Sequence, residues 1–167
     1  MKDLKQYIRD VPDFPSAGVI FRDIAPLLRD HFAEAIDALS SMLREQSWSS
    51  IDAVAGVESR GFILAAALAE RYRKGFVPIR KKGKLPPPVL HRTYELEYGS
   101  GTLEIQPGSG RLLIVDDVLA TGGTLRASAE LASDAGYLVS GFVVLIDLRL
   151  ATEFRWRDLP ALSVLTY

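Results

Sequence analysis

Two neighbouring acids and a Thr/Gly loop stand only a few residues apart, as Asp116-Asp117 and Thr121-Gly-Gly-Thr124. They follow the apolar run 112–115, which lacks polar alternation, as a parallel strand covered on both faces requires. Open α/β sheets bind ligands beyond the carboxyl ends of their strands, and we expect both acids where this strand surfaces. Glycine lets N–H groups close around an anion, threonine adds donors, and a helix N-terminus adds positive potential. A ligand with a phosphate and a sugar diol would satisfy both halves, whereas a capped turn needs one acid, not two.

A second candidate anion site is the segment Gly56-Val-Glu-Ser-Arg-Gly61. It has the glycine spacing of a P-loop, but Phe62 and Ile63 stand where a nucleotide triphosphatase needs Lys and Ser or Thr. Arg60 offers a planar guanidinium that suits phosphate oxygens. The alternative interpretation is a capped turn that carries an arginine at the surface.

Positive charge is concentrated in Arg80-Lys-Lys-Gly-Lys84, which precedes Leu85 and three prolines. Neither helix nor sheet is expected to continue through this segment. Cations on a closing loop would stabilise the charge of a departing polyanion and exclude water. From charge alone, a solvated face is an equally good interpretation.

Two further segments could serve catalysis and base binding. In Tyr94-Glu-Leu-Glu-Tyr-Gly99, a carboxyl at Glu97 could donate or take a proton, or it could alternate with buried neighbours in a hairpin. The segment 14–28, FPSAGVIFRDIAPLL, is predicted to be irregular. It could offer apolar faces and backbone groups to a flat ring, or form an ordinary loop on the core.

Together these five motifs resemble the type I phosphoribosyltransferases, in the family's order, from about Phe14 to about Ile146. RKKGKLP, YELEYG and the hood-like FPSAGVIFRDI resemble the adenine-specific members in particular. The resemblance implies an α/β fold with a mostly parallel central sheet flanked by helices. It also implies a single domain over 1–167, with a small hood formed mainly by 10–30 and a flexible hairpin lid over about 81–105.

The resemblance further implies an activity, namely transfer of the phosphoribosyl group from 5-phosphoribosyl 1-pyrophosphate (PRPP) to N9 of adenine, with AMP and pyrophosphate as products. Mg²⁺ would be held through PRPP and water, without dedicated protein ligands. A homodimer is implied, in which Arg80 reaches the neighbouring subunit's site, and so is a cis peptide in the 58–61 turn. Two alternatives are a 6-oxopurine phosphoribosyltransferase and a PRPP-binding regulator without catalysis.

The family's roles carry over residue by residue. They assign catalytic roles to Glu97, Arg60 and Tyr98; ribose and phosphate binding to Asp116, Asp117, Ala120, Thr121, Gly122, Gly123 and Thr124; pyrophosphate binding to Glu58, Ser59, Arg60, Arg80, Lys81 and Lys84; and adenine binding to Ile20, Phe21, Arg22 and Val118.

The elements that must position these residues follow from hydrophobic periodicity, which indicates alternating strands and helices and therefore a mostly parallel sheet covered on both faces. Strands are predicted over 51–57, 76–79, 112–115, 142–146 and 161–165, a hairpin over 94–105, and helices over 4–11, 31–46, 62–72 and 125–135.

Composition limits the partners. With 167 residues the chain can bury a sizeable core, and its net charge of −1 gives no general attraction to nucleic acid or to an anionic membrane. The lack of cysteine excludes disulfides and thiolate chemistry and fits a reducing cytoplasm. No apolar run reaches membrane-spanning length, so we expect a cytoplasmic enzyme.

Overall fold

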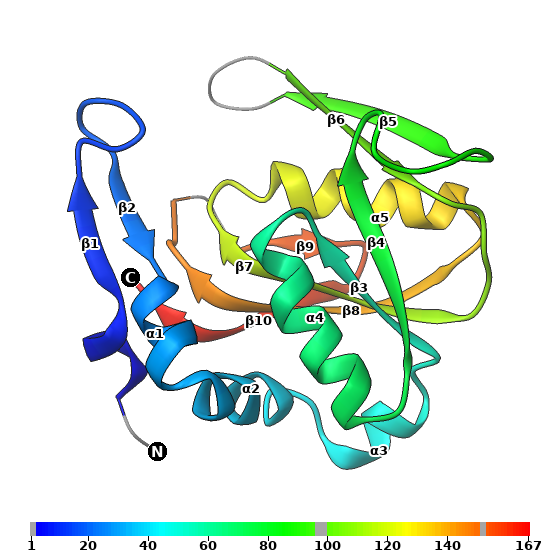
Figure 1. Ribbon diagram of the computed structural model, residues 1–167. Coiled ribbons are helices and arrows are strands. Elements are labelled where there is room, and N and C mark those ends of the chain that lie inside the picture. Colours follow the sequence, from blue (N-terminus) through cyan, green and yellow to red (C-terminus); the bar gives the residue numbers. More distant parts are fainter. Residues whose placement is uncertain (1–2, 96–99, 151–152) are drawn as a thin grey trace. The chain divides into compact units, whose positions relative to one another are not determined.

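The computed structural model describes residues 3–95, 100–150 and 153–167, and the chain divides into two compact units, Met1–Ala38 and Leu39–Tyr167. The elements of the first unit are the 3-10 helix η1 (Leu4–Tyr7), β1 (Arg9–Pro12), β2 (Ile20–Asp23), α1 (Ala25–Asp30) and most of α2 (Phe32–Ser40). Strands β1 and β2 form an antiparallel hairpin (Figure 1). An ion pair of 2.7 Å between Arg9 and Asp23 joins the two strands, as does the pair of Arg22 and Asp10.

Two predictions for the first unit are wrong. The helix predicted over 4–11 ends at Tyr7, and Val11 lies in β1, because it pairs with Phe21 of β2. The segment 14–28 is not irregular throughout, since it contains β2 and most of α1, where a proline in the first turn favours helix initiation. The predicted hood, 10–30, lies within this unit, and its role stays a prediction.

The second unit is built on one sheet. Its elements are α3 (Glu45–Ser49), β3 (Ala53–Val57), α4 (Arg60–Arg71), β4 (Gly75–Lys81), β5 (Leu90–Glu95), β6 (Ser100–Ile105), β7 (Arg111–Leu119), α5 (Gly123–Asp134), β8 (Leu138–Asp147), β9 (Arg155–Trp156) and β10 (Leu159–Thr166). Within the described residues the sheet has eight strands in the order β5-β6-β4-β3-β7-β8-β10-β9 (Figure 1). The run β4-β3-β7-β8-β10 is parallel, and β6, β5 and β9 join antiparallel. This confirms the predicted mixed and mostly parallel sheet.

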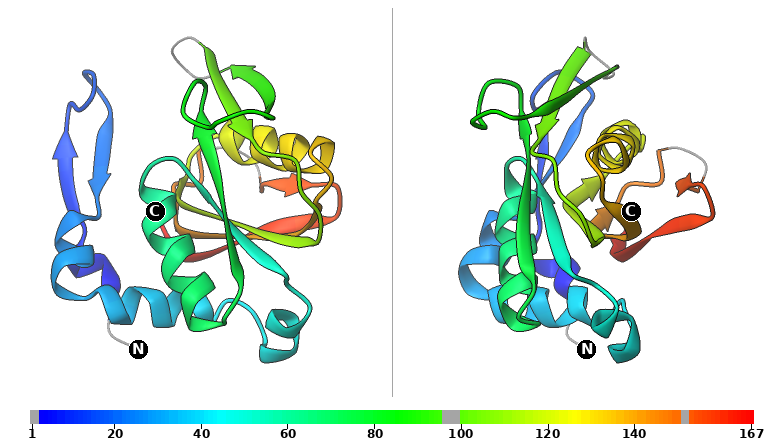
Figure 2. Two further views of the ribbon diagram at one scale, coloured as in Figure 1. Left: turned by 45° about the vertical axis from the view of Figure 1, so that its right-hand side comes forward. Right: turned by 90° about the vertical axis from the view of Figure 1, so that its right-hand side faces the viewer.

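Helices α4 and α5 cover opposite faces of this sheet (Figure 2). Leu64 and Leu68 of α4 are fully buried, and so are Ala129 and Ala132 of α5, which is the arrangement that continuous apolar strands require. Because β3 and β7 are parallel neighbours, their carboxyl ends meet at one edge of the sheet. The turn before α4 and the loop before α5 therefore lie at the same edge.

The predicted strands of this unit are confirmed, and the tail strand β10 pairs in parallel with β8. The predicted hairpin is present, but its first strand, β5, begins at Leu90 rather than at Tyr94. The helix predicted over 31–46 is wrong as a single helix, because α2 ends at Ser40 and α3 begins at Glu45. In the part of the chain that the structure describes, no helix is both long enough and apolar enough to cross a bilayer.

Candidate active site

The paired acids lie inside β7, not beyond its end. The sequence predicted that the strand would surface at Asp116, but β7 continues to Leu119, which pairs with Asp147 of β8. Asp116 and Asp117 are only 8 % and 7 % exposed. Burial, followed by the charge of Asp117, raises the pKa of Asp116 well above its usual range. The site thus holds two acids in a place that disfavours two full negative charges.

Arg60 supplies the compensating charge. Its guanidinium Nη2 lies 2.6 Å from Oδ2 of Asp117, so the start of α4 is joined to the end of β7. Oδ2 of Asp117 is buried, and it accepts no hydrogen bond from the described residues. Its contact with Arg60 has the distance of an ion pair but not the geometry of a hydrogen bond. A buried carboxylate oxygen with unused lone pairs is a ready acceptor for a ligand hydroxyl.

Gly61 permits this close approach. A Cβ atom at this position would lie 2.9 Å from Oδ1 of Asp116 and 3.0 Å from the carbonyl oxygen of Val115. Any side chain there would push the first turn of α4 away from β7. The glycine at the end of the 56–61 segment is therefore required for the packing of α4 against β7, whether or not the segment also binds an anion.

The Thr/Gly loop leads directly into α5. Gly122 is the N-cap residue, with φ of +87° in the left-handed region, and the first helical hydrogen bond runs from the Arg126 N–H to the Gly122 carbonyl. The N–H groups of the first turn have no partner within the helix, so they can bind an anion. Thr121 is exposed, while Ala120, Gly123 and Thr124 are half-buried.

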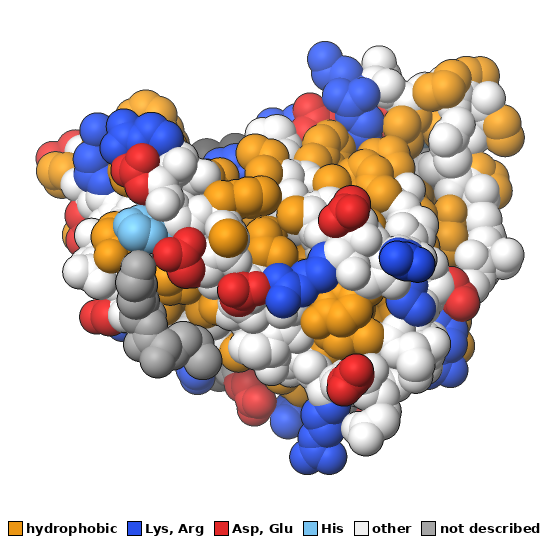
Figure 3. Space-filling view, turned by 60° about the horizontal axis from the view of Figure 1, so that its bottom comes forward, with side chains coloured by type: hydrophobic (Ala, Val, Ile, Leu, Met, Phe, Trp, Pro, Cys, Tyr) orange, Lys and Arg blue, Asp and Glu red, His pale blue; other side chains and the backbone are white. Residues whose placement is uncertain are grey.

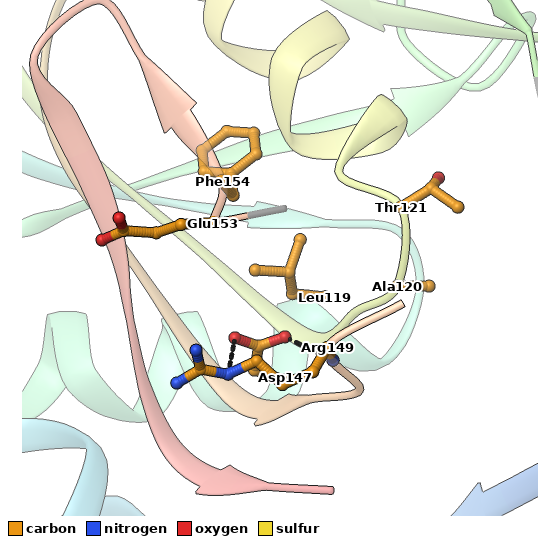
Figure 4. Close-up of a pocket in the computed structure, with 7 residues that line it drawn as sticks. All are labelled: Leu119, Ala120, Thr121, Asp147, Arg149, Glu153 and Phe154. Atoms are coloured by element: carbon orange, nitrogen blue, oxygen red, sulfur yellow. Dashed lines mark hydrogen bonds and ion pairs between the residues drawn. The ribbon is translucent and has the colours of Figure 1, made fainter. Parts of the chain in front are cut away.

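An open hollow lies beside this loop (Figure 4). Asp147 holds the 147–149 turn, accepting a hydrogen bond of 2.9 Å from the Arg149 N–H and lying 3.1 Å from Arg149 Nε. The Phe154 ring packs closely against Gly122, because a Cβ at Gly122 would lie 2.7 Å from Cδ2 of the ring. The residues that line the hollow are Leu119, Ala120, Thr121, Asp147, Arg149, Glu153 and Phe154.

Three residues of this hollow, Asp147, Arg149 and Phe154, are not among the site residues predicted from the sequence. A signal for Phe154 was present, since it alternates with Trp156 in a charged stretch, which is the period-2 pattern of a strand. Both aromatic rings are buried, and both contact Phe142 edge to face, at 5.2 Å and 6.3 Å between ring centroids. No comparable signal marks Asp147 or Arg149.

The turn before α4 is the predicted pyrophosphate loop. The Glu58–Ser59 peptide bond is cis, as the resemblance implied. The Glu58 carboxylate accepts hydrogen bonds from the Lys81 N–H at 2.9 Å and from Arg80 Nε at 3.4 Å. Because this carboxylate already accepts hydrogen bonds from the basic segment, Glu58 could contact a phosphate only through its main chain.

The basic segment begins within a strand, which the sequence analysis did not expect. β4 continues to Lys81, where Arg80 and Lys81 pair with Glu104 and Leu103 of β6. The side chains of Lys81, Lys82 and Lys84 are exposed. Among the described residues their ammonium groups form no ion pair within 4.0 Å, so they are free to meet an anion.

The predicted adenine contacts are distributed over both units. Ile20, Phe21 and Arg22 lie on β2 of the first unit, where Ile20 is 51 % exposed and Phe21 packs edge to face with Phe14. Val118 is half-buried on β7 of the second unit. Their common contact with a base stays a prediction.

Glu97 and Tyr98 lie outside the described residues, so their predicted catalytic roles stay predictions. The described end of the hairpin lies against the Thr/Gly loop: a Cβ at Gly123 would lie 3.4 Å from the carbonyl oxygen of Glu95. Strand β5 also contacts α5 through Arg92, which pairs with Glu130 at 3.0 Å and with Asp134 at 2.6 Å. The hairpin is thus attached to the helix that starts at the candidate site.

Comparison with known proteins agrees with this geometry. The phosphoribosyl transferase domain family matches residues 27–161. The adenine phosphoribosyltransferase of Bdellovibrio bacteriovorus is 50 % identical over 166 residues, which is 99 % of both chains. The crystal structure of adenine phosphoribosyltransferase from Rhodothermus marinus is 45 % identical, covers 98 % of this chain and 96 % of its own, and has a TM-score of 0.84. The Saccharomyces cerevisiae enzyme, complexed with an imino-altritol bisphosphate and adenine, is 35 % identical, with a TM-score of 0.85 and 96 % of both chains covered.

Proposed function

The chain belongs to the phosphoribosyltransferase family, and on that premise we propose that it is the enzyme that transfers the phosphoribosyl group of PRPP to N9 of adenine. The bond from C1′ to the pyrophosphate oxygen breaks, the bond from C1′ to N9 forms, and AMP and pyrophosphate are released. The β7–α5 junction supports this function most directly. It combines a buried carboxylate pair with a glycine-capped helix N-terminus within a few residues.

The junction suits the ribose 5-phosphate part of the substrate. The first-turn N–H groups of α5 and the Thr121 and Thr124 hydroxyls would donate to the 5-phosphate. Asp116 and Asp117 would accept from the ribose hydroxyls. The buried Oδ2 of Asp117 supports that role, because it pairs with Arg60 but accepts no hydrogen bond from the described residues. An anion and a diol are thereby bound by groups of opposite character at one strand end.

The pyrophosphate part needs cations. Arg60, Arg80, Lys81 and Lys84 are the candidates, and the exposed lysine side chains support this assignment. These charges would stabilise the negative charge that develops on the leaving group as the C1′ bond breaks.

Mg²⁺ would be held through PRPP and water, without dedicated protein ligands. Within the described part of the chain, no group of three His, Asp or Glu side chains gathers as a metal set. The buried Asp117 carboxyl group would face the ion through water and the ribose hydroxyls, because Mg²⁺ retains waters and substrate ligands. When bound, Mg²⁺ would supply charge neutralisation on the pyrophosphate oxygens.

Glu97 is the proposed acid/base for the purine, and Tyr98 would close over the pyrophosphate side. A carboxyl near N7 could exchange a proton with the base as N9 forms its bond to C1′. Ile20, Phe21 and Arg22 are the proposed hood contacts of adenine, with Val118 on the other side of the ring.

We also propose a homodimer in the cytoplasm. Apolar side chains gather in exposed patches between charged ones on the face that Figure 3 shows. Ile63 of α4 is 47 % exposed and Phe76 of β4 is 40 % exposed, which favours coverage by a second chain. Analytical ultracentrifugation tests the dimer, and a monomer at micromolar concentration would reject it.

The test of function is a purine panel. The enzyme is incubated with PRPP, Mg²⁺ and adenine, hypoxanthine or guanine, and pyrophosphate release is followed. Adenine alone is expected to react. Turnover of hypoxanthine or guanine above that of adenine would instead assign a 6-oxopurine enzyme. Calorimetric binding of PRPP without turnover of any base would assign a regulator.

A further inference from the structure

Glu104 is a buried acid that none of the predicted roles uses. It lies on β6 with 1 % of its surface exposed, and its carboxylate accepts three backbone hydrogen bonds. Oε2 accepts from the Gly83 N–H at 2.9 Å, while Oε1 accepts from the Lys84 N–H at 2.6 Å and from the Leu85 N–H at 2.5 Å. A buried carboxylate is costly unless it is hydrogen-bonded, and here each oxygen is engaged.

Burial opposes the ionisation of Glu104, but the bonds from Gly83, Leu85 and Lys84 outweigh it and lower its pKa, with a smaller contribution from His91. His91 lies directly across from Glu104 on β5. Glu104 is therefore held as a carboxylate at neutral pH, in the form that accepts from all three amides.

The basic segment is held along its whole length, not only at Glu104. The Lys81 N–H donates to Glu58 Oε2 at 2.9 Å, and the Lys82 N–H donates to the Thr102 carbonyl at 3.0 Å. With the three bonds to Glu104, every N–H group from residue 81 to residue 85 has an acceptor. Gly83, with φ of +85°, makes the turn possible.

This arrangement separates the two kinds of donor in the segment. The backbone amides are used by the protein itself, so they are unavailable to a ligand. The side chains of Lys81, Lys82 and Lys84 are exposed, and their like charges repel one another. The fixed backbone keeps these like charges together before a ligand arrives. A polyanion that binds here therefore does not lose binding free energy in ordering the segment.

We propose that Glu104 is a positioning residue that fixes the turn 81–85 and thereby sets the affinity of the site for the pyrophosphate part of its substrate. This inference rests on the proposed function, because that function supplies the polyanion. Glu104 itself contacts neither the reacting carbon nor the base. Its role is to hold the lysine-bearing turn in the geometry that binds.

The test compares Glu104→Gln with Glu70→Gln, which alters an exposed glutamate on α4. Glutamine keeps the volume of Glu104 but places an NH₂ group against backbone donors. Because preorganisation of the turn is lost, Glu104→Gln should raise the KM for PRPP and the Kd for inorganic pyrophosphate with Mg²⁺ about tenfold. The Kd for AMP, which has no pyrophosphate, and kcat should change less than about threefold. Hydrogen exchange at residues 83–85 should accelerate, and Glu70→Gln should match the wild type.

Equal weakening of AMP and pyrophosphate binding would overturn the proposal, as would unchanged pyrophosphate binding despite faster exchange. If Glu104→Gln does not fold, Glu104→Asp is measured instead, because it keeps the charge and shortens the reach. For Glu104→Asp too, pyrophosphate binding should weaken more than AMP binding, and equal weakening of both would overturn the proposal. Wild-type protein that binds pyrophosphate but turns over no purine would refute the proposed function. The effect of Glu104→Gln on the Kd for pyrophosphate would still test the role of Glu104.

Discussion

Arg60 and Asp117 form an ion pair of 2.6 Å between the first turn of α4 and the end of β7. The pair joins the segment predicted to bind pyrophosphate to the segment predicted to bind ribose. Beside this pair, burial and the neighbouring charge of Asp117 raise the pKa of Asp116. The two halves of the candidate site are therefore electrostatically coupled before any substrate binds.

Asp117→Asn should weaken the use of PRPP. The substitution removes the charge that Arg60 faces and weakens the acceptor for a ribose hydroxyl. A hydrogen bond to a charged group contributes about 1.5–3 kcal/mol, so the KM for PRPP should rise roughly 10- to 100-fold. Steady-state kinetics and PRPP calorimetry measure the effect, with Asp158→Asn as an exposed control. An unchanged KM would remove Asp117 from the substrate site.

Asp116→Asn should stabilise the protein at neutral pH while impairing activity. The folded-state pKa of Asp116 is raised, so the folded chain binds the proton more tightly than the unfolded chain. The contribution of protonated Asp116 to the free energy of unfolding is fully present below the pKa of this group in the unfolded chain, near 3.8. It is lost as pH rises through the pKa of Asp116 in the folded chain. Asparagine cannot ionise and avoids this loss.

Thermal unfolding of Asp116→Asn and the wild type at pH 5 and at pH 8 measures the difference. At pH 8 the free energy of unfolding of the variant should exceed that of the wild type by about 1–3 kcal/mol, the usual desolvation penalty of a buried polar group, which corresponds to roughly 2–12 °C in Tm. The gain should shrink at pH 5. An equal difference at both pH values would show that the titration of Asp116 does not control stability.

Local patterns predicted the parallel sheet because its strands are continuous apolar runs, such as Leu112–Val115. They did not predict where α2 ends, since this depends on a contact between distant residues. Trp48 donates a hydrogen bond of 3.2 Å to the Ser40 carbonyl and stacks on Tyr72, with ring centroids 3.8 Å apart. These contacts place the indole at the C-terminal end of α4, although the apolar periodicity of α2 continues past Ser40.

The candidate site was predictable where the residues are neighbours in sequence and not where they meet across the fold. The loop 121–124 follows its strand directly, so its chemistry was visible in the sequence. The bonds between Glu104 and Gly83 or Lys84 join segments that no periodicity relates. Glu104 reads in the sequence as one polar residue between Leu103 and Ile105.

Gly122→Ala should damage both stability and substrate binding. A left-handed φ costs a non-glycine residue about 1–2 kcal/mol, and the added Cβ would also lie 2.7 Å from the Phe154 ring. The loop must shift, so the KM for PRPP should rise. Urea unfolding and kinetics measure the two effects.

Gly141→Ala is the matched control for Gly122→Ala. Gly141 lies on β8, and a Cβ there would meet only Leu113 Cδ1, at an ordinary 3.5 Å. It should leave the KM for PRPP unchanged. Adding Phe154→Ala to Gly122→Ala should relieve the contact but not the cost of the left-handed φ. A fully stable Gly122→Ala single variant would contradict the strain at this N-cap.

Glu97→Gln should lower turnover more than affinity. Glu97 lies outside the described residues, but the end of β5 lies against the loop before α5, where Glu95 approaches Gly123. A positioned acid/base contributes about 10²- to 10⁴-fold to rate, so kcat should fall by roughly that factor. The KM values for adenine and PRPP should change little, because glutamine keeps the size and polarity of the side chain. Glu95→Gln, an exposed change on the same hairpin, is the control and should keep its kcat. A variant that loses affinity for adenine at undiminished kcat would make Glu97 a binding residue instead.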